Sequence, residues 1–265
     1  RETIVSKNYD RGTVKLVYED IAQDIEEGIG LINDELYSIP KYHFNTKAAN
    51  AFAARFYLYY RKYDKVIEYA SKVLGSSPAN MLRDYSPYPS LSSYFEIGNQ
   101  YIKAEENSNL LLQTAVSAYA RMTGVYKTYR RYGHPIAKML ETLLSAGIWG
   151  NERSLKYFDK LFGTQEYGLV FPKQIEFFEY TDKVAGIGQA HIVTTAFTTD
   201  ELLLCRAEAY IYQKEYTQAV ADIQAWFDTH ASGVTVSRSA VNQYYGSQAT
   251  EKTKKELHPK FTIEN

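Results

Sequence analysis

The residues best suited to contact a ligand surround Trp149, one of two tryptophans in the chain. Glycines lie close to it on both sides, and Asn151, Glu152 and Arg153 follow. A sugar ring has an apolar face of C–H bonds and a polar rim of hydroxyls, so an aromatic ring beside amide, carboxylate and guanidinium groups suits it. Trp149, Asn151 and Arg153 are therefore the first candidates for ligand contacts. The alternative is that Trp149 merely closes the end of a helix.

Tyrosine is unusually frequent, with 25 residues in the chain, although it does not dominate an ordinary domain. Tyr129 and Tyr132 enclose two arginines and form a second candidate group. Tyr85 and Tyr88 lie beside prolines and form a third. The tyrosines in regular helical segments are expected to pack rather than to bind a ligand.

No pattern of residues predicts catalysis, a metal or a cofactor. The five histidines are scattered, without the His-Glu-x-x-His spacing, and the single cysteine cannot form a metal-binding pair. A glycosidase with two carboxylates is the best enzymatic alternative. Its pair would be Asp200 with Glu201, or Glu152 with Asp159. Because Asp200 and Glu201 are better explained as first-turn charges of a helix, we expect no catalytic residue and no enzyme.

Composition excludes some classes of partner. The 265 residues include 30 basic and 31 acidic side chains, so no overall field attracts nucleic acid or an anionic membrane. No segment approaches 18 uninterrupted apolar residues, and the first residues lack the apolar core of a signal peptide. Cys205 lies in a predicted buried helix, where a reactive thiol is not expected.

Two helical hairpins are predicted to support these candidates. Residues 45–78 form two helices joined at residues 61–63, and residues 199–227 repeat the pattern with no gap. Tyr63 and Tyr216 differ by 153 positions, as do Tyr57 and Tyr210. The second helix of each copy has an apolar stripe, and all five positions are apolar in both copies. Val66, Ile67, Ala70, Val73 and Leu74 correspond to Ala219, Val220, Ile223, Trp226 and Phe227.

These hairpins resemble the tetratricopeptide repeat, in which small and aromatic residues recur over about 34 positions. Small residues allow helices to cross closely, and aromatic rings fill the gaps beside them. The resemblance implies a mainly α fold of tetratricopeptide-like hairpins, an α-α superhelix, with an irregular loop-rich insert and a few short strands.

Several other segments have expected structures. A helix is predicted over residues 16–36 and another over 135–144. Residues 109–124 fit either a strand or a helix, residues 168–199 indicate a β-hairpin that turns at 186–188, and residues 76–109 are expected to be irregular. We divide a single 1–265 domain into a first repeat region (16–78), an aromatic insert (79–197), a second repeat (198–229) and an irregular tail (230–265).

The order of these parts, from VYEDIAQDIEEGI through TKAANAFAARFYLYY and YDKVIEYASKVLG to FTTDELLLCRAEAYI, resembles the SusD/RagB family. Members are outer-membrane lipoproteins of Bacteroidetes that lie on the cell surface and capture glycans or other nutrients for a TonB-dependent, SusC-like transporter. The resemblance covers roughly residues 17–227. It implies a fragment truncated at both ends, without the family's lipidated cysteine, so membrane attachment would require an anchor absent from this sequence.

Two functions therefore remain open. The resemblance implies a non-enzymatic binding protein for an oligosaccharide or polysaccharide. The alternative is a tetratricopeptide-type scaffold whose groove holds a protein or peptide partner.

Overall fold

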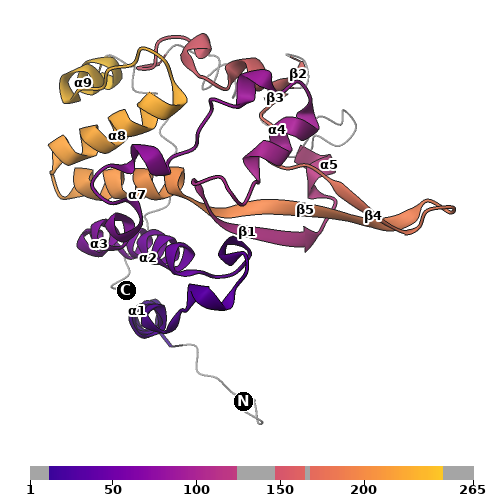
Figure 1. Cartoon of the computed structure of the whole chain (residues 1–265). Helices are drawn as coiled ribbons and strands as arrows, with labels where there is room; N and C mark the ends of the chain where they lie inside the picture. The colour runs from indigo at the N-terminus through magenta and orange to yellow at the C-terminus, as the bar shows by residue number, and fades with distance from the viewer. Residues whose placement is uncertain (1–11, 124–146, 165–167, 247–265) are drawn as a thin grey trace. The chain divides into compact units, whose positions relative to one another are not determined.

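The computed structural model describes residues 12–123, 147–164 and 168–246 (Figure 1). The chain divides into two units: residues 1–32 with 249–265, and residues 33–248. In the first unit, α1 (Val14–Gly28) begins at Thr13, whose hydroxyl accepts a hydrogen bond from the Leu16 amide. One 3-10 turn, Ile29–Leu31, follows it. The predicted helix over 16–36 is therefore wrong in extent, because two glycines weaken the helix at this point.

The second unit contains the repeated hairpins, α2 (Thr46–Tyr60) with α3 (Tyr63–Leu74), and α7 (Thr199–Tyr212) with α8 (Tyr216–His230). Both turns contain a non-glycine residue in the left-handed region, Arg61 with φ 60° and Lys214 with φ 64°. These residues are also 153 positions apart. The amide after each one donates to the carbonyl of Tyr57 or Tyr210, at 2.9 and 2.8 Å. The predicted internal repeat is confirmed.

Small side chains allow the hairpins to pack closely, with α3 against α7 and α2 against α7. Ala48, Ala53, Ala54, Ala70, Ala207 and Ala209 are all buried. Helix α2 is not buried on every side, since 71% of Tyr59 is exposed.

A buried ion pair joins the two hairpins. The Arg206 guanidinium on α7 donates to both oxygens of Asp222 on α8, at 2.8 and 2.7 Å. It also donates to the Gly75 carbonyl and the Ser71 hydroxyl at the end of α3, at 2.9 and 3.2 Å. In the first repeat, Ala53 and Tyr69 occupy the equivalent positions, so the two copies fill the same place with different chemistry.

An antiparallel sheet of order β1-β5-β4 leads into the second repeat. Its strands are β1 (Asn109–Val116), β4 (Phe177–Asp182) and β5 (Ile187–Thr198), and β5 continues directly into α7. The predicted β-hairpin is confirmed for residues 177–198, with its turn at residues 183–186 rather than 186–188. Figure 1 shows that its β4–β5 end projects from the rest of this unit. The segment for which the sequence allowed either a strand or a helix contains one of each, because the short helix α5 (Tyr119–Thr123) follows β1.

The insert and the tail are more regular than expected. Helix α4 (Tyr94–Tyr101) starts at a capping box formed by Ser93 and Glu96, inside the segment predicted to be irregular. The short strands β2 (Phe162–Thr164) and β3 (Gly168–Val170) pair with each other. Helix α9 (Arg238–Gly246) corrects the prediction of an irregular tail. The helix predicted at 135–144 lies outside the described residues.

The mainly helical fold with a few short strands agrees with the expected fold class. Among the described helices, none combines the length and the apolar character needed to cross a bilayer.

Candidate functional site

A cavity of about 730 Å³ lies where the insert meets the second repeat. We call it the polar pocket. Its walls come from eight residues between positions 79 and 89, from residues 106 and 107, from Lys156, and from the C-terminal end of α8 with Ser232. Segments more than 100 residues apart in sequence therefore form one site.

Aromatic residues form the packed wall behind the polar pocket. Tyr85 lines the pocket but is only 9% exposed. Its ring centroid lies 5.2 Å from that of Tyr88, 5.6 Å from that of Tyr157 and 5.1 Å from that of His230. Tyr88 is fully buried, and burial raises the pKa of its hydroxyl to about 12. Of these two sequence candidates, only Tyr85 reaches the pocket.

The rim of the pocket consists of exposed polar side chains. The Asp84 carboxylate accepts hydrogen bonds from the Ser86 amide and hydroxyl, at 2.8 and 2.7 Å. The Lys156 ammonium donates to the Asp228 carbonyl at 2.7 Å, which joins the loop before β2 to the end of α8. A carboxylate only accepts hydrogen bonds and an ammonium only donates them, so this rim can pair with ligand hydroxyls in both directions.

A buried arginine supports the pocket from below. Arg83 is 1% exposed, and its guanidinium donates to the Tyr101 carbonyl at 3.0 Å and to Asn109 Oδ1 at 2.7 Å. Its Nε lies 4.0 Å from Asp200 Oδ2. Burial raises the pKa of Asp200 while Arg83 opposes that rise. These contacts fix the backbone from which Asp84 and Tyr85 extend.

His230 closes the other side of this buried network. Its Nε2 lies 3.4 Å from Asp200 Oδ1, and its ring stacks on Trp226 with a centroid separation of 4.1 Å. Burial lowers the pKa of His230 to about 4. The imidazole is therefore neutral at pH 7, and the end of α8 contributes no cation to the pocket through this residue.

Trp149 occupies a different place from the one expected of an exposed ring. It is partly buried against the cluster that contains Leu155, Phe227 and Val236. A Cβ on Gly147 would lie 2.5 Å from its indole ring, so the ring covers that glycine. This packing favours a structural role for Trp149 over a ligand contact.

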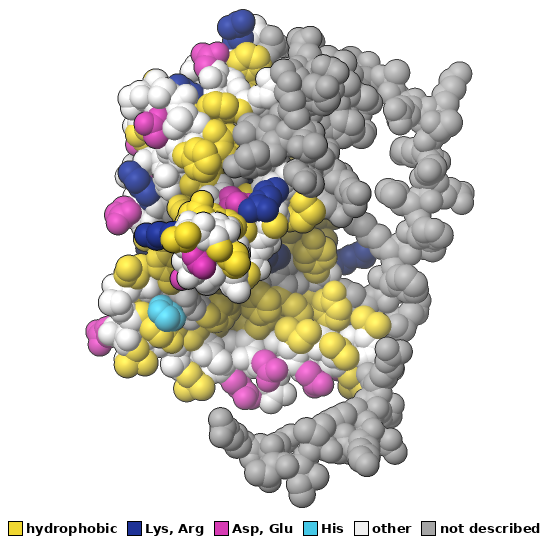
Figure 2. Space-filling model, turned by 90° about the vertical axis from the view of Figure 1, so that its right-hand side faces the viewer, with side chains coloured by type: hydrophobic (Ala, Val, Ile, Leu, Met, Phe, Trp, Pro, Cys, Tyr) yellow, Lys and Arg dark blue, Asp and Glu magenta, His cyan; other side chains and the backbone are white. Residues whose placement is uncertain are grey.

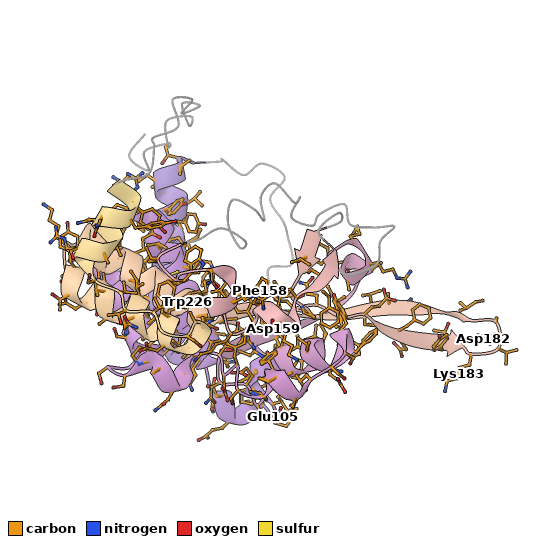
Figure 3. All side chains as sticks on the ribbon, turned by 90° about the horizontal axis from the view of Figure 1, so that it is seen from above. Glu105, Phe158, Asp159, Asp182, Lys183 and Trp226 are labelled. Carbon is orange, nitrogen blue, oxygen red and sulfur yellow. The ribbon has the colours of Figure 1, made fainter. Side chains whose placement is uncertain are left out.

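The polar neighbours of Trp149 remain exposed. Asn151 Oδ1 accepts from the Arg153 amide at 3.0 Å, and the Arg153 guanidinium lies 5.8 Å from the Phe158 ring centroid. Neither residue lines the polar pocket. Figure 3 shows Phe158 in the same region as Trp226 of α8. A role for Trp149, Asn151 and Arg153 as ligand contacts stays a prediction.

Tyr129 and Tyr132, the remaining candidates, lie outside the described residues. The polar lining residues that the sequence did not indicate are Asn80, Arg83, Asp84, Ser86, Glu106, Asn107, Lys156, Asp228, Thr229 and Ser232. No local pattern identifies them, because they meet only after the insert folds against α8.

Two of the four carboxylates considered for a glycosidase, Glu201 and Asp200, have structural partners. Glu201 forms a two-point pair with the Arg55 guanidinium, with contacts of 2.6 and 2.5 Å. Asp200 belongs to the buried network of Arg83 and His230. The exposed Asp159 lies next to Phe158 (Figure 3), while the Glu152 side chain is not described. Within the described ranges, no group of histidine, cysteine and acidic residues is arranged to hold a metal.

Comparison with known proteins gives one family and one fold. Residues 2–58 match the sequence model of the SusD-like family described as "Starch-binding associating with outer membrane". A SusD-like carbohydrate binding protein from Bacteroides vulgatus shares the fold at 15% identity and a TM-score of 0.56, over 92% of this chain and 50% of that one. A SusD superfamily protein from Bacteroides thetaiotaomicron shares the fold at 13% identity and a TM-score of 0.54, over 91% of this chain and 58% of that one.

No curated protein matches the chain significantly. The chain spans between half and three-fifths of the length of the two solved structures. The family match at the N-terminal end and the shared fold over nine-tenths of the chain agree with the resemblance inferred from sequence. The chain therefore has a SusD-like fold, and its N-terminal residues 2–58 match the SusD-like family.

Proposed function

We propose that this chain binds a glycan without catalysing its cleavage, and that the polar pocket holds part of that glycan. The observation that carries the proposal is a 730 Å³ pocket whose rim presents Asp84, Ser86 and Lys156 beside the buried ring of Tyr85, in a SusD-like fold. Hydroxyl groups donate to the carboxylate and accept from the ammonium, and hydrogen bonds to charged groups are the stronger ones.

The pocket also favours an uncharged ligand. Three carboxylates line it, from Asp84, Glu106 and Asp228. The Arg83 charge lies beside Asp200 instead, which leaves Lys156 as the exposed cation among its lining residues. A ligand with its own carboxylates would bind poorly, because it would place hydrogen-bond acceptors against a wall that consists mainly of acceptors. A neutral sugar supplies the donors that this wall needs.

The cellular setting is part of the same proposal. The SusD-like family is described as associating with the outer membrane, and we place this chain on the cell surface. A TonB-dependent, SusC-like transporter would receive the captured glycan. The likeness of fold supports this setting, and co-purification with such a transporter from outer-membrane extracts would test it.

Affinity electrophoresis tests glycan binding directly. Native gels that contain soluble starch, xylan or laminarin should retard the chain in at least one case. Asp84→Ala and Lys156→Ala should each reduce that retardation, whereas Asp64→Ala should not, since Asp64 is also exposed but lies on α3 and not in the pocket lining. Trp149→Ala with unchanged retardation and reduced thermal stability would assign Trp149 to packing alone.

A scaffold for a protein partner is the second candidate, and exposed apolar residues on the repeats favour it. On α2 these are Phe52 and Tyr59, and on α7 they are Leu204 and Ile211, in each case seven residues apart and thus on one helix face. This function predicts capture of a protein that Tyr59→Ser and Ile211→Ser abolish, with no retardation by any glycan.

A further inference from the structure

The end of the β4–β5 hairpin carries aromatic residues that have no place in the core. Each residue of β4 is exposed, and the end of the hairpin projects from the rest of its unit (Figure 1). Asp182 and Lys183 mark its tip in Figure 3. Figure 2 looks along the projecting hairpin and shows hydrophobic side chains around it at the surface.

Two rings lie together on one face of this hairpin. Phe178 and Tyr180 are two residues apart on β4 and thus on the same side of the strand. Their centroids are 4.8 Å apart with an interplanar angle of 71°. Phe178 is 36% exposed and Tyr180 is 52% exposed, so both rings keep surface for a ligand.

The opposite strand leaves these rings uncovered. Phe178 pairs with Ala190, and Tyr180 pairs with Gly188. A Cβ on Gly188 would lie 2.8 Å from Phe178 Cε1, so the ring rests against bare backbone. We call Phe178, Tyr180, Gly188 and Ala190 the hairpin platform. The two rings stay accessible because almost no side chain lies opposite them.

Polar groups adjoin the platform at one edge. The Arg121 guanidinium lies 5.9 Å from the Phe178 centroid and forms two hydrogen bonds with Glu176, at 2.5 and 2.7 Å. The Arg121 side chain is 43% exposed. A guanidinium held in a fixed orientation beside an aromatic ring presents a donor fork at the edge of an apolar surface.

The size of the platform decides between a sugar and a protein. With the side-chain areas typical of aromatic residues and the exposed fractions above, the two rings offer roughly 200 Å². A stable protein interface covers about 800 Å² on each partner. The exposed Phe177 and Val116 do not enlarge the platform, because both pair across His191 and lie on the opposite face of the sheet. One or two sugar rings match this area.

We propose that the hairpin platform is a second glycan-contact site, separate from the polar pocket, which stacks on the apolar face of a pyranose ring in a polysaccharide chain. This inference rests on the proposed function. A polysaccharide long enough to span both sites would gain at the second contact from the effective concentration set by the first. A short oligosaccharide occupies the pocket alone.

The test uses the polysaccharide that retards the chain most strongly and a trisaccharide of the same linkage. Phe178→Ala and Tyr180→Ala should weaken polysaccharide binding roughly threefold to tenfold, in line with the energy of one aromatic contact. Trisaccharide affinity, measured by calorimetry, should stay unchanged. Phe177→Ala is the matched control, since it removes an exposed ring of the same strand from the other face. Phe178→Trp, which keeps an aromatic ring at this position, should bind the polysaccharide as well as the unaltered chain does.

Three outcomes would overturn the inference. If Phe178→Ala and Phe177→Ala bind the polysaccharide equally well, the platform is not a glycan-contact site. The proposal for the polar pocket would be unaffected. Loss of transporter co-purification in Phe178→Ala, with glycan binding kept, would make the surface a protein-docking site. Failure of every polysaccharide to retard the unaltered chain would overturn the proposed function and this inference together.

Discussion

The buried pair of Arg206 and Asp222 should hold the second repeat together and join it to the first. Both side chains are at least 93% buried. Asp222→Leu leaves a buried guanidinium, although the Gly75 carbonyl and the Ser71 hydroxyl still accept from it. Arg206→Met leaves a buried carboxylate that has lost both of its guanidinium bonds. Removing one partner of a buried pair costs about 3–5 kcal/mol, and Arg206→Met should lie at the upper end.

The double variant separates the pair from simple loss of packing. Replacing both charges with apolar groups of similar volume is often close to neutral. Arg206→Met with Asp222→Leu should therefore lie within about 2 kcal/mol of the unaltered chain, far below the sum of the single effects. Free energies of unfolding from urea titrations followed by circular dichroism would measure all three variants.

A surface pair supplies the control. Glu68 on α3 contacts Lys65 and Lys72 at 3.2 and 2.7 Å, and all three side chains are more than a third exposed. Glu68→Gln should change stability by less than about 0.5 kcal/mol. If Asp222→Leu costs no more than Glu68→Gln, or if the single effects simply add, the reasoning about this buried pair is refuted.

Three further predictions concern pH, thiol chemistry and packing. Burial lowers the pKa of His230 to about 4 from an unfolded value near 6.5, so the unfolded chain binds the proton first. Stability should then fall by roughly 3 kcal/mol as pH drops through that window, and His230→Phe should flatten this part of a pH series of urea titrations. Burial raises the pKa of Cys205 to about 12, so a thiol reagent at pH 8 should label it only in urea, and fast labelling of the folded chain would contradict this. Gly98→Ala should cost about 1–3 kcal/mol in the same titrations, because a Cβ there would clash with Ile175 Cγ2, whereas Gly28→Ala meets nothing and should cost nothing.

The helical hairpins could be predicted from sequence because residues close together in the chain determine them. The spacing of small and aromatic residues recurs at one offset, and the structure repeats even the left-handed residues at Arg61 and Lys214. Helix α4 was missed because its capping box, Ser93 with Glu96, lies in a segment rich in serine and proline. A strong cap decides the structure there against an unfavourable composition.

The candidate site was less predictable because it depends on distant contacts. Trp149 reads as an exposed ring in sequence, yet the cluster that partly buries it includes Phe227, far along the chain. Tyr85 was identified by its setting beside prolines, whereas its neighbours Lys156 and Asp228 come from other segments. No periodicity joins a loop to the end of a helix across more than 100 residues.

The most direct test is calorimetric titration of a trisaccharide, taken from the polysaccharide that gives retardation, into the chain and two double variants. Asp84→Ala with Lys156→Ala removes a carboxylate and an ammonium from the pocket rim. Lys62→Ala with Asp64→Ala removes the same two charges from the exposed turn before α3 and its first residues. Binding should be at least tenfold weaker in the pocket variant, on the order of one charge-assisted hydrogen bond, and unchanged in the control. Equal affinities in all three proteins would contradict the proposal for the polar pocket.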